Sequence, residues 1–170
     1  MARGAIAAAL NRCPPPRLPA VPGAGLYRGA FVTLEERDSH DLRGCIGHIA
    51  GDRPLGEVIR QVAVSAARHD PRFPPVAPDE LEALRIEISV LSEPVLIPTS
   101  DLYGIVIGRD GLLVRRERTQ AVLLPQVATE QGFDRDAFLN AVCHKAGLAA
   151  GSWREPATQV FTFTADVFVE

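Results

Sequence analysis

One amphipathic helical repeat constrains the fold of this chain more than any other feature. Between residues 55 and 66, apolar side chains recur at intervals of three and four: Leu55, Val58, Ile59, Val62, Ala63 and Ala66. This spacing places them on one face, so the sequence predicts a helix that packs against a core on that side. Asp52 is expected to cap the helix, and Pro54 suits its first turn. Because Pro71 disfavours helix at the residue before it, the helix should end near His69.

Other segments carry strand patterns. Apolar residues alternate or cluster as they do in strands over residues 27–35, 42–49, 84–91, 119–124 and 158–169. The polar turn at 37–41 is expected to join the first two strands into an antiparallel hairpin. Asp110-Gly111 predicts a second hairpin, between residues 105–107 and 112–114.

Short helices are expected at residues 2–11 and 125–132, and from Asp134 to a glycine cap at Gly147. Strands and helices are mixed without regular β-α-β spacing, so we expect an α+β fold with a mainly antiparallel sheet flanked by helices. The 170 residues suit one domain. We place it at 1–170, with an N-terminal helix at 1–11, a Pro/Gly-rich connector at 12–26 and a globular body at 27–170.

Composition excludes several classes of function. The chain is 46% hydrophobic and 23% charged, with a net charge of −3, which is typical of a globular domain. It has no basic excess for nucleic acid or an anionic membrane surface, and no apolar run long enough to span a bilayer. The first ten residues lack the apolar core of a signal peptide. We therefore expect a cytoplasmic protein without membrane or nucleic-acid partners.

The run Leu42–Gly47, with the sequence LRGCIG, is the strongest candidate for a functional site. In an extended chain, Arg43 and Cys45 share one face. A cation close to a thiol favours the reactive thiolate, so Cys45 is a candidate nucleophile. The alternative is that Cys45 is a small buried residue of a central strand, as free cysteines often are.

Each neighbour of this cysteine also has two interpretations. Gly44 and Gly47 indicate close approach of a ligand, or else a bulge or a tight contact between helix and sheet. Arg43 would bind a carboxylate or phosphate, or would pair structurally with Glu87 or Asp70.

Further polar residues complete the list of candidates. Asp70 and Arg72 would serve as an acid/base group and an anion site, or would belong to a turn that follows the helix. Glu87 is a general-base candidate if its face of the strand is covered, and a solvated charge if that face is wet. His48, His69 or His144 would act as the base for the cysteine.

The cysteines and histidines do not predict a metal centre. Cys13, Cys45 and Cys143 are odd in number and widely spaced, which also argues against a disulfide framework. Cys143 and His144 are adjacent, and neighbouring residues of a helix point about 100° apart. We therefore expect no bound metal and no cofactor.

Six segments, taken in order, resemble the AMMECR domain family. They are GAFVTL at 29–34, LRGCIG at 42–47, AA at 66–67 with DPRF at 70–73, IEISVL at 86–91, LLPQVA at 123–128, and CHKAGL at 143–148 with Trp153. Together they cover nearly the whole chain.

The resemblance implies an α+β fold of two unequal lobes with a groove between them. In bacteria and archaea, such proteins look like component A of the AmmeMemoRadiSam system. The partners implied are a Memo-like protein and a radical S-adenosylmethionine protein, so we expect an adaptor or substrate-binding component. The alternative is an enzyme that acts on a small anionic substrate through Cys45, with Arg43 orienting that substrate.

Overall fold

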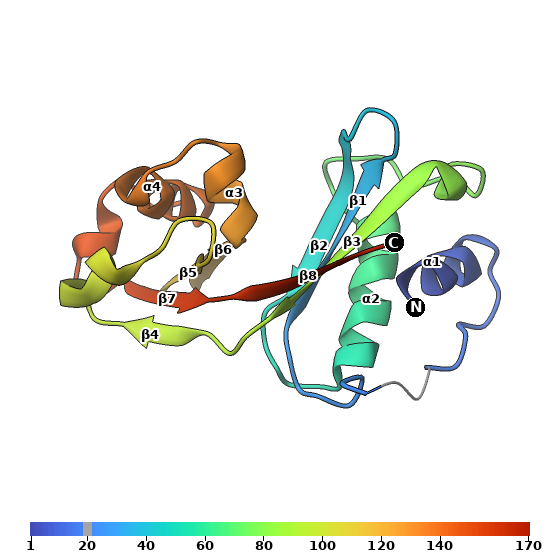
Figure 1. Ribbon diagram of the computed structural model, residues 1–170, viewed down its shortest axis with the longest axis horizontal. Helices are drawn as coiled ribbons and strands as arrows, with labels where there is room; N and C mark the ends of the chain where they lie inside the picture. Colours follow the sequence, from blue (N-terminus) through green and yellow to red (C-terminus); the bar gives the residue numbers. More distant parts are fainter. Residues whose placement is uncertain (19–21) are drawn as a thin grey trace. The chain divides into compact units, whose positions relative to one another are not determined.

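The computed structural model describes residues 1–18 and 22–170, which form two compact units (Figure 1). Unit 1 comprises Met1–Leu91 and Asp166–Glu170, and unit 2 comprises Ser92–Ala165. Each unit contains a four-stranded antiparallel sheet with helices, so the predicted α+β class is confirmed, with two sheets rather than one. Residues 19–21 of the expected connector lie outside the described residues.

Unit 1 contains the N-terminal half of the chain and the C-terminal strand. Its elements are α1 (Ala2–Leu10), β1 (Ala30–Glu36), β2 (Leu42–His48), α2 (Leu55–Arg68), the 3-10 helix η1 (Leu81–Ala83), β3 (Leu84–Leu91) and β8 (Ala165–Val169). The strand order is β2-β1-β3-β8, so β2 forms one edge of the sheet. β1 and β2 pair antiparallel, which confirms the predicted hairpin.

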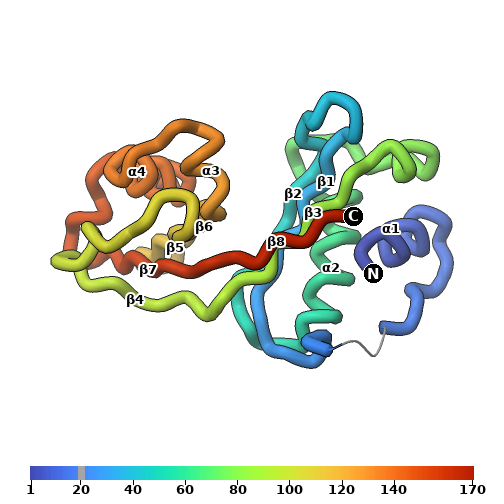
Figure 2. Tube along the Cα trace, in the orientation of Figure 1, coloured from blue at the N-terminus to red at the C-terminus, as the bar shows by residue number. Residues whose placement is uncertain are grey.

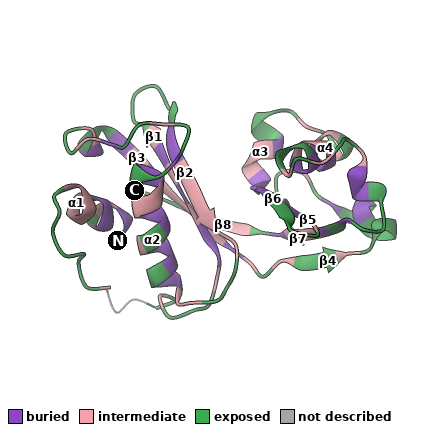
Figure 3. Cartoon of the chain, turned by 180° about the vertical axis from the view of Figure 1, so that it is seen from behind, coloured by how far each residue is buried: buried purple, intermediate pink, exposed green. Residues whose placement is uncertain are grey.

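The core of unit 1 lies between α2 and one face of this sheet. Buried residues of α2, including Val62 and Ala66, belong to one apolar cluster with Val32 and Leu34 of β1 and Ile86 of β3. Figure 3 shows buried residues along both α2 and β1. The amphipathic pattern therefore predicted the correct helix and its buried face.

The predicted cap of α2 is wrong. Pro54 rather than Asp52 is the N-cap residue, and no side chain caps this end. Pro54 is extended, with φ −56° and ψ 134°, so the helix begins only at Leu55. Asp52 instead interacts with two neighbours, because its Oδ1 lies 2.7 Å from His48 Nε2 and 3.1 Å from Arg53 Nε.

The two ends of the chain meet within unit 1. Arg3 of α1 pairs with Glu170, with 2.6 Å between Nε and Oε1. Its terminal nitrogens also donate to the carbonyls of Leu81 and Leu84, at 2.6 and 2.8 Å. As the tube in Figure 2 shows, the chain enters unit 2 after β3 and returns to unit 1 in β8.

Unit 2 has its own core. Its elements are β4 (Val95–Ile97), the 3-10 helix η2 (Thr99–Gly104), β5 (Gly111–Arg116), β6 (Thr119–Leu123), α3 (Pro125–Glu130), α4 (Arg135–Lys145), the 3-10 helix η3 (Ser152–Arg154) and β7 (Gln159–Phe163). The strand order is β4-β7-β5-β6. Both predicted ends of α4 are confirmed: Asp134 Oδ1 accepts from the Ala137 N–H at 2.8 Å, and Gly147 has a φ of 75°.

The hairpin predicted at Asp110-Gly111 is wrong. β5 begins at Gly111 and pairs with β6 instead, through a turn that contains Glu117 at a φ of 53°. Asp110 is buried, and its Oδ2 accepts from the Val106 N–H at 2.8 Å. The aspartate therefore fastens the preceding loop rather than forming the tip of a hairpin.

The helices are short. The longest of those in the described residues is α2, with 14 residues. Across residues 1–18 and 22–170, no helix combines the length and apolar character needed to cross a bilayer.

Candidate functional site

Three polar side chains from adjacent strands of unit 1 form a row that includes Cys45. Cys45 of β2 is in register with Thr33 of β1, and Thr33 is in register with Glu87 of β3. Residues in register project from the same face of a sheet, so a thiol, a hydroxyl and a carboxylate lie in line. Thr33 Oγ1 donates a hydrogen bond to Cys45 Sγ at 3.4 Å. We call these three residues the Cys45 row.

The Cys45 row lies on the sheet face opposite α2. Its chain neighbours Val32, Ile46 and Ile88 pack in the core that contains α2, and successive strand residues point to opposite faces. Cys45 is half-buried, whereas Cys143 in α4 is fully buried, and burial raises the pKa of the Cys143 thiol. Of these two cysteines, only Cys45 has a partly accessible side chain.

Both glycines of the motif are explained by packing within unit 1. A Cβ at Gly44 would lie 2.4 Å from the carbonyl oxygen of Ala66, so this residue marks a tight contact between β2 and α2. A Cβ at Gly47 would lie 2.2 Å from the ring of Phe31. These contacts support the structural interpretation of both glycines rather than the approach of a ligand.

The edge of β2 is bound at Cys45 by the turn that follows α2. The Cys45 N–H donates to Asp70 Oδ2 at 2.8 Å, and a terminal nitrogen of Arg72 donates to the Cys45 carbonyl at 3.3 Å. The Arg72 N–H also donates to Asp70 Oδ1 at 3.1 Å. This bond within the turn agrees with the alternative interpretation, in which Asp70 and Arg72 belong to a turn after the helix. Edge strands normally leave such groups unpaired, so this turn takes the place of a further strand.

Asp70 and Arg72 form an ion pair that fixes the charge of both groups. Arg72 donates to the two Asp70 oxygens from Nε at 2.9 Å and from a terminal nitrogen at 2.7 Å. These bonds, with those from the backbone N–H groups of Cys45 and Arg72, hold the pKa of Asp70 well below its usual range despite burial. The pair raises the pKa of Arg72, and the negative charge of an ionised Cys45 contributes to this.

Arg72 is an accessible cation next to Cys45. Its side chain is 53% exposed, whereas that of Asp70 is only 2% exposed. Its guanidinium also lies 5.4 Å from the centre of the Phe73 ring. Asp70 and Phe73 therefore position a guanidinium that still has surface for an anion.

Arg43 pairs with Glu80, whereas the two partners considered from the sequence were Glu87 and Asp70. Its Nε and one terminal nitrogen donate to the two carboxylate oxygens of Glu80 at 3.1 and 3.2 Å, and the other terminal nitrogen donates to the Pro74 carbonyl at 2.9 Å. Arg43 is only 9% exposed. Bonds from the Ala77 N–H and from Arg43 lower the pKa of Glu80. These contacts support a structural role for Arg43.

The three candidate histidines lie in different places. His48 is an odd number of residues from Cys45 along β2, so alternation turns it to the other face, where it contacts Asp52. His69 is exposed at the C-terminal end of α2. His144 is exposed on α4, in unit 2.

Sequence reasoning overlooked Thr33 and Glu80. Thr33 had part of a signal, because the predicted hairpin brings β1 beside β2, but the bulge at Arg43 that pairs Thr33 with Cys45 was not predicted. For Glu80 the sequence carried no signal, since this residue lies 37 residues from Arg43 in an irregular loop. In the part of the chain that the structure describes, no group of three His, Cys, Asp or Glu residues is placed to hold a metal ion.

The comparisons with known proteins identify the family. A family model described as AMMECR1 matches residues 1–168. The chain belongs to the AMMECR1 family. The resemblance seen in the sequence motifs is thereby confirmed.

AMMECR1 relatives occur in several organisms. A protein from Methanothermobacter thermautotrophicus is 46% identical over 147 residues, which cover 84% of this chain and 76% of that protein. Protein TK0174 from Thermococcus kodakarensis is 45% identical over 148 residues, covering 84% of this chain and 72% of its own. The crystal structure of the uncharacterized protein PH0010 from Pyrococcus horikoshii matches with a TM-score of 0.94 at 39% identity, over 99% of this chain and 87% of that one.

Proposed function

We propose that this AMMECR1-family protein is an adaptor or substrate-binding component that works with a Memo-like protein and a radical S-adenosylmethionine protein. In this proposal it holds a small anionic ligand beside the Cys45 row and presents that ligand to its partners. The partners follow from the family resemblance. The single observation that supports the ligand is the half-exposed Arg72 guanidinium, fixed by buried Asp70 at the backbone of Cys45.

The chemistry of this position suits a carboxylate or a phosphate. A guanidinium offers several donors in one plane, and it stays charged at any physiological pH. Arg72 is oriented before any ligand arrives, because two of its nitrogens already bond to Asp70. The hydroxyl of Thr33, beside Cys45, adds a polar group that can select among anions.

Assembly with the partners is the direct test. We expect the purified chain to co-elute with the Memo-like and radical S-adenosylmethionine proteins of its own source organism in size-exclusion chromatography. Native mass spectrometry of the wild-type chain purified from that source should detect a bound small anion. Arg72→Met should remove this anion, because the variant keeps the apolar stem but loses the charge.

Arg118→Met is the matched control, since Arg118 is an exposed arginine in the turn between β5 and β6. It should keep both the anion and the partners. The adaptor proposal fails if the three proteins elute separately at about 50 µM each, a concentration that detects even a micromolar complex. The ligand proposal fails if Arg72→Met and wild type carry the same small molecules.

The alternative is an enzyme that uses Cys45 as a nucleophile. The observation that favours it is the partial exposure of Cys45 together with an adjacent cation, since such a cation favours thiolate. Because Arg43 is already bonded to Glu80 and Pro74, Arg72 would orient the substrate in this alternative as well.

Alkylation by iodoacetamide distinguishes the enzyme from the adaptor. In this reaction the Cys45 sulfur bonds to the reagent carbon and iodide leaves. If Cys45 is a nucleophile, its alkylation should reach half its maximal rate well below pH 8.5, the usual pKa of a thiol. Arg72→Met should shift this midpoint upward. Peptide mapping by mass spectrometry across pH 6–9 measures the rate at each cysteine.

Two other cysteines of the same chain serve as references. Cys13 is exposed and Cys143 is fully buried, so they should mark the rates of an accessible thiol and a protected thiol. A Cys45 that reacts no faster than Cys13 at every pH would end the nucleophile hypothesis and leave the binding function as the better account.

A further inference from the structure

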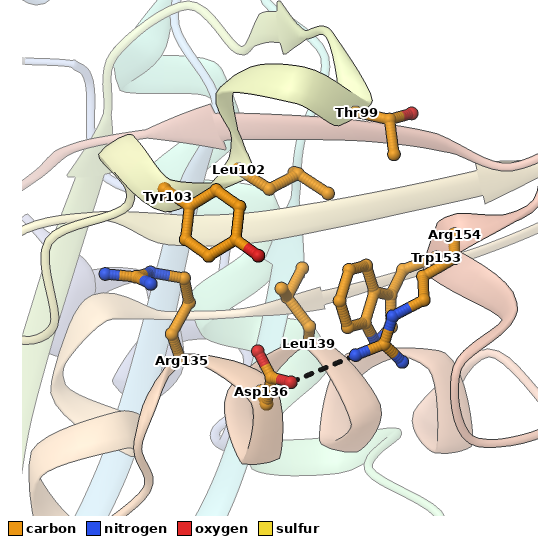
Figure 4. Close-up of a pocket in the computed structure, with 8 residues that line it drawn as sticks. All are labelled: Thr99, Leu102, Tyr103, Arg135, Asp136, Leu139, Trp153 and Arg154. Carbon is orange, nitrogen blue, oxygen red and sulfur yellow. Dashed lines mark hydrogen bonds and ion pairs between the residues drawn. The ribbon is translucent and has the colours of Figure 1, made fainter.

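Unit 2 contains a cavity that is separate from the Cys45 row. Three elements line it: η2, the first turns of α4, and η3. Figure 4 shows the lining side chains of these three elements, with the Arg135 guanidinium extending away from Leu139 and Trp153. The cavity has a volume of about 290 Å³. For comparison, an apolar protein cavity of about 150 Å³ accommodates benzene, so this one has space for a single aromatic ring with substituents.

The inner wall of the cavity is apolar. Leu102, Leu139 and Trp153 are 3%, 0% and 7% exposed, so they form a fixed surface within the core of unit 2. The only polar atom of the indole is already satisfied, because Trp153 Nε1 donates to Asn140 Oδ1 at 2.9 Å. Because the Arg154 guanidinium covers one face of the indole and Trp153 is only 7% exposed, the indole offers the cavity a small carbon surface at its edge.

Two arginines stack on the aromatic residues that line the cavity. The Arg135 guanidinium lies 5.4 Å from the centre of the Tyr103 ring, and that of Arg154 lies 3.6 Å from the Trp153 ring. In Figure 4 the Tyr103 hydroxyl points toward Leu139, between these two pairs. Tyr103 is 80% exposed, so it forms the outer rim of the cavity.

The charges around the cavity leave one positive charge in excess. Arg154 pairs with Asp136 at 3.0 Å, so these two groups compensate each other. Arg135 forms no ion pair with any residue that the structure describes. Its Nε is buried without a hydrogen-bond partner in the described parts of the chain, and an unsatisfied buried donor is costly.

Arg135 is the first residue of α4, an 11-residue helix whose N-terminal end favours negative charge. The Asp134 carboxylate already caps this end by accepting from the Ala137 N–H, and Asp136 lies in the first turn. The attraction for a further anion therefore depends on the Arg135 guanidinium and not on the helix end.

We propose that this cavity binds a small aromatic carboxylate with one ring. The ring lies against Leu102, Leu139 and the uncovered edge of Trp153, and the carboxylate accepts hydrogen bonds from the terminal nitrogens of Arg135. This site is independent of the function proposed for the Cys45 row, because every residue that lines it belongs to unit 2.

An isosteric series of ligands tests the proposal. Benzoate, benzamide and benzamidine have nearly the same shape but are negative, neutral and positive. The chain has one tryptophan, so the indole N–H resonance of Trp153 in a two-dimensional NMR spectrum reports occupancy of the cavity directly. We expect a saturable shift with benzoate at a Kd of about 1 mM or below, as suits a ligand of this size. Benzamide should bind about tenfold more weakly, because a charge-assisted hydrogen bond is lost.

Variants assign the carboxylate to Arg135. Arg135→Met should weaken benzoate binding about tenfold and benzamide binding much less, and Arg135→Lys should restore part of the benzoate affinity. Arg118→Met, an exposed arginine of the same unit, should change neither. The indole resonance without ligand shows whether each variant keeps the fold of unit 2.

Each contrary result overturns a defined part of the proposal. If benzoate produces no saturable shift up to about 20 mM, the site does not bind this class of ligand. If benzamide or benzamidine binds as tightly as benzoate, or Arg135→Met lowers the affinity for all three equally, the anion assignment is wrong. If cyclohexanecarboxylate binds as tightly as benzoate, the aromatic assignment is wrong.

Discussion

Asp70→Ala is expected to destabilise the protein by about 3 kcal/mol, with a fall in Tm of roughly 10 °C for a chain of this size. The side chain of Asp70 is 2% exposed and accepts hydrogen bonds from Arg72 and from the Cys45 N–H. The alanine variant loses charge-assisted bonds and leaves that N–H without its acceptor at the sheet edge. Urea unfolding and calorimetry measure the change.

Asp79→Ala is the matched control, because Asp79 is an exposed aspartate in the same loop region. It should change the unfolding free energy by less than about 0.5 kcal/mol. Asp70→Asn should fall between the two, since its amide oxygen can still accept from the Cys45 N–H. An Asp70→Ala variant as stable as Asp79→Ala would show that this carboxylate does not hold the edge of β2.

The same carboxylate sets a pH dependence with a definite sign. The folded-state pKa of Asp70 is lowered, chiefly by Arg72, below the unfolded value of about 3.9. Its contribution is therefore complete above the unfolded pKa and is lost as the pH falls through the folded pKa. The stability difference between wild type and Asp70→Asn should be full at pH 7 and shrink below about pH 4. A difference that does not vary with pH would contradict this assignment.

Gly44→Ala should have a comparable effect, a loss of about 3 kcal/mol or failure to fold. The added Cβ would lie 2.4 Å from the Ala66 carbonyl oxygen, which belongs to the backbone of α2. A helix backbone cannot move aside as a flexible side chain can, so β2 and α2 would have to separate. Expression level, circular dichroism and urea unfolding measure this loss.

Substitutions at two other glycines serve as references for this prediction. Gly104→Ala should be close to neutral, because its Cβ would have no neighbour within 4 Å. Gly47→Ala should be intermediate, since the added Cβ would meet the half-buried ring of Phe31, which can rotate. If Gly44→Ala is as stable as Gly104→Ala, the contact between β2 and α2 is looser than the structure indicates.

The sequence indicated the hairpin that carries the Cys45 row but not its register. The hairpin and its polar turn were both predicted, but the pairing of Glu35 with Leu42 beside the turn would by itself place Thr33 opposite Gly44. A bulge at Arg43 shifts the register by one residue and brings Thr33 opposite Cys45. Prediction from turn residues also failed at Asp110-Gly111, where a buried aspartate bonds to the Val106 N–H. A dipeptide typical of turns does not reveal whether its carboxylate has a backbone partner.

The sequence by itself determined the class of the fold, most of its helices and strands, and the family. These depend on periodic burial and on capping residues, which act over a few positions of the chain. Only the tertiary structure decided that Arg43 pairs with Glu80, that Asp70 and Arg72 bind the edge of β2, and that Arg135 stacks on Tyr103. Such contacts join residues 25 or more positions apart. They depend on how an irregular loop packs against a strand or helix that is distant in the sequence, and no local sequence pattern specifies that packing.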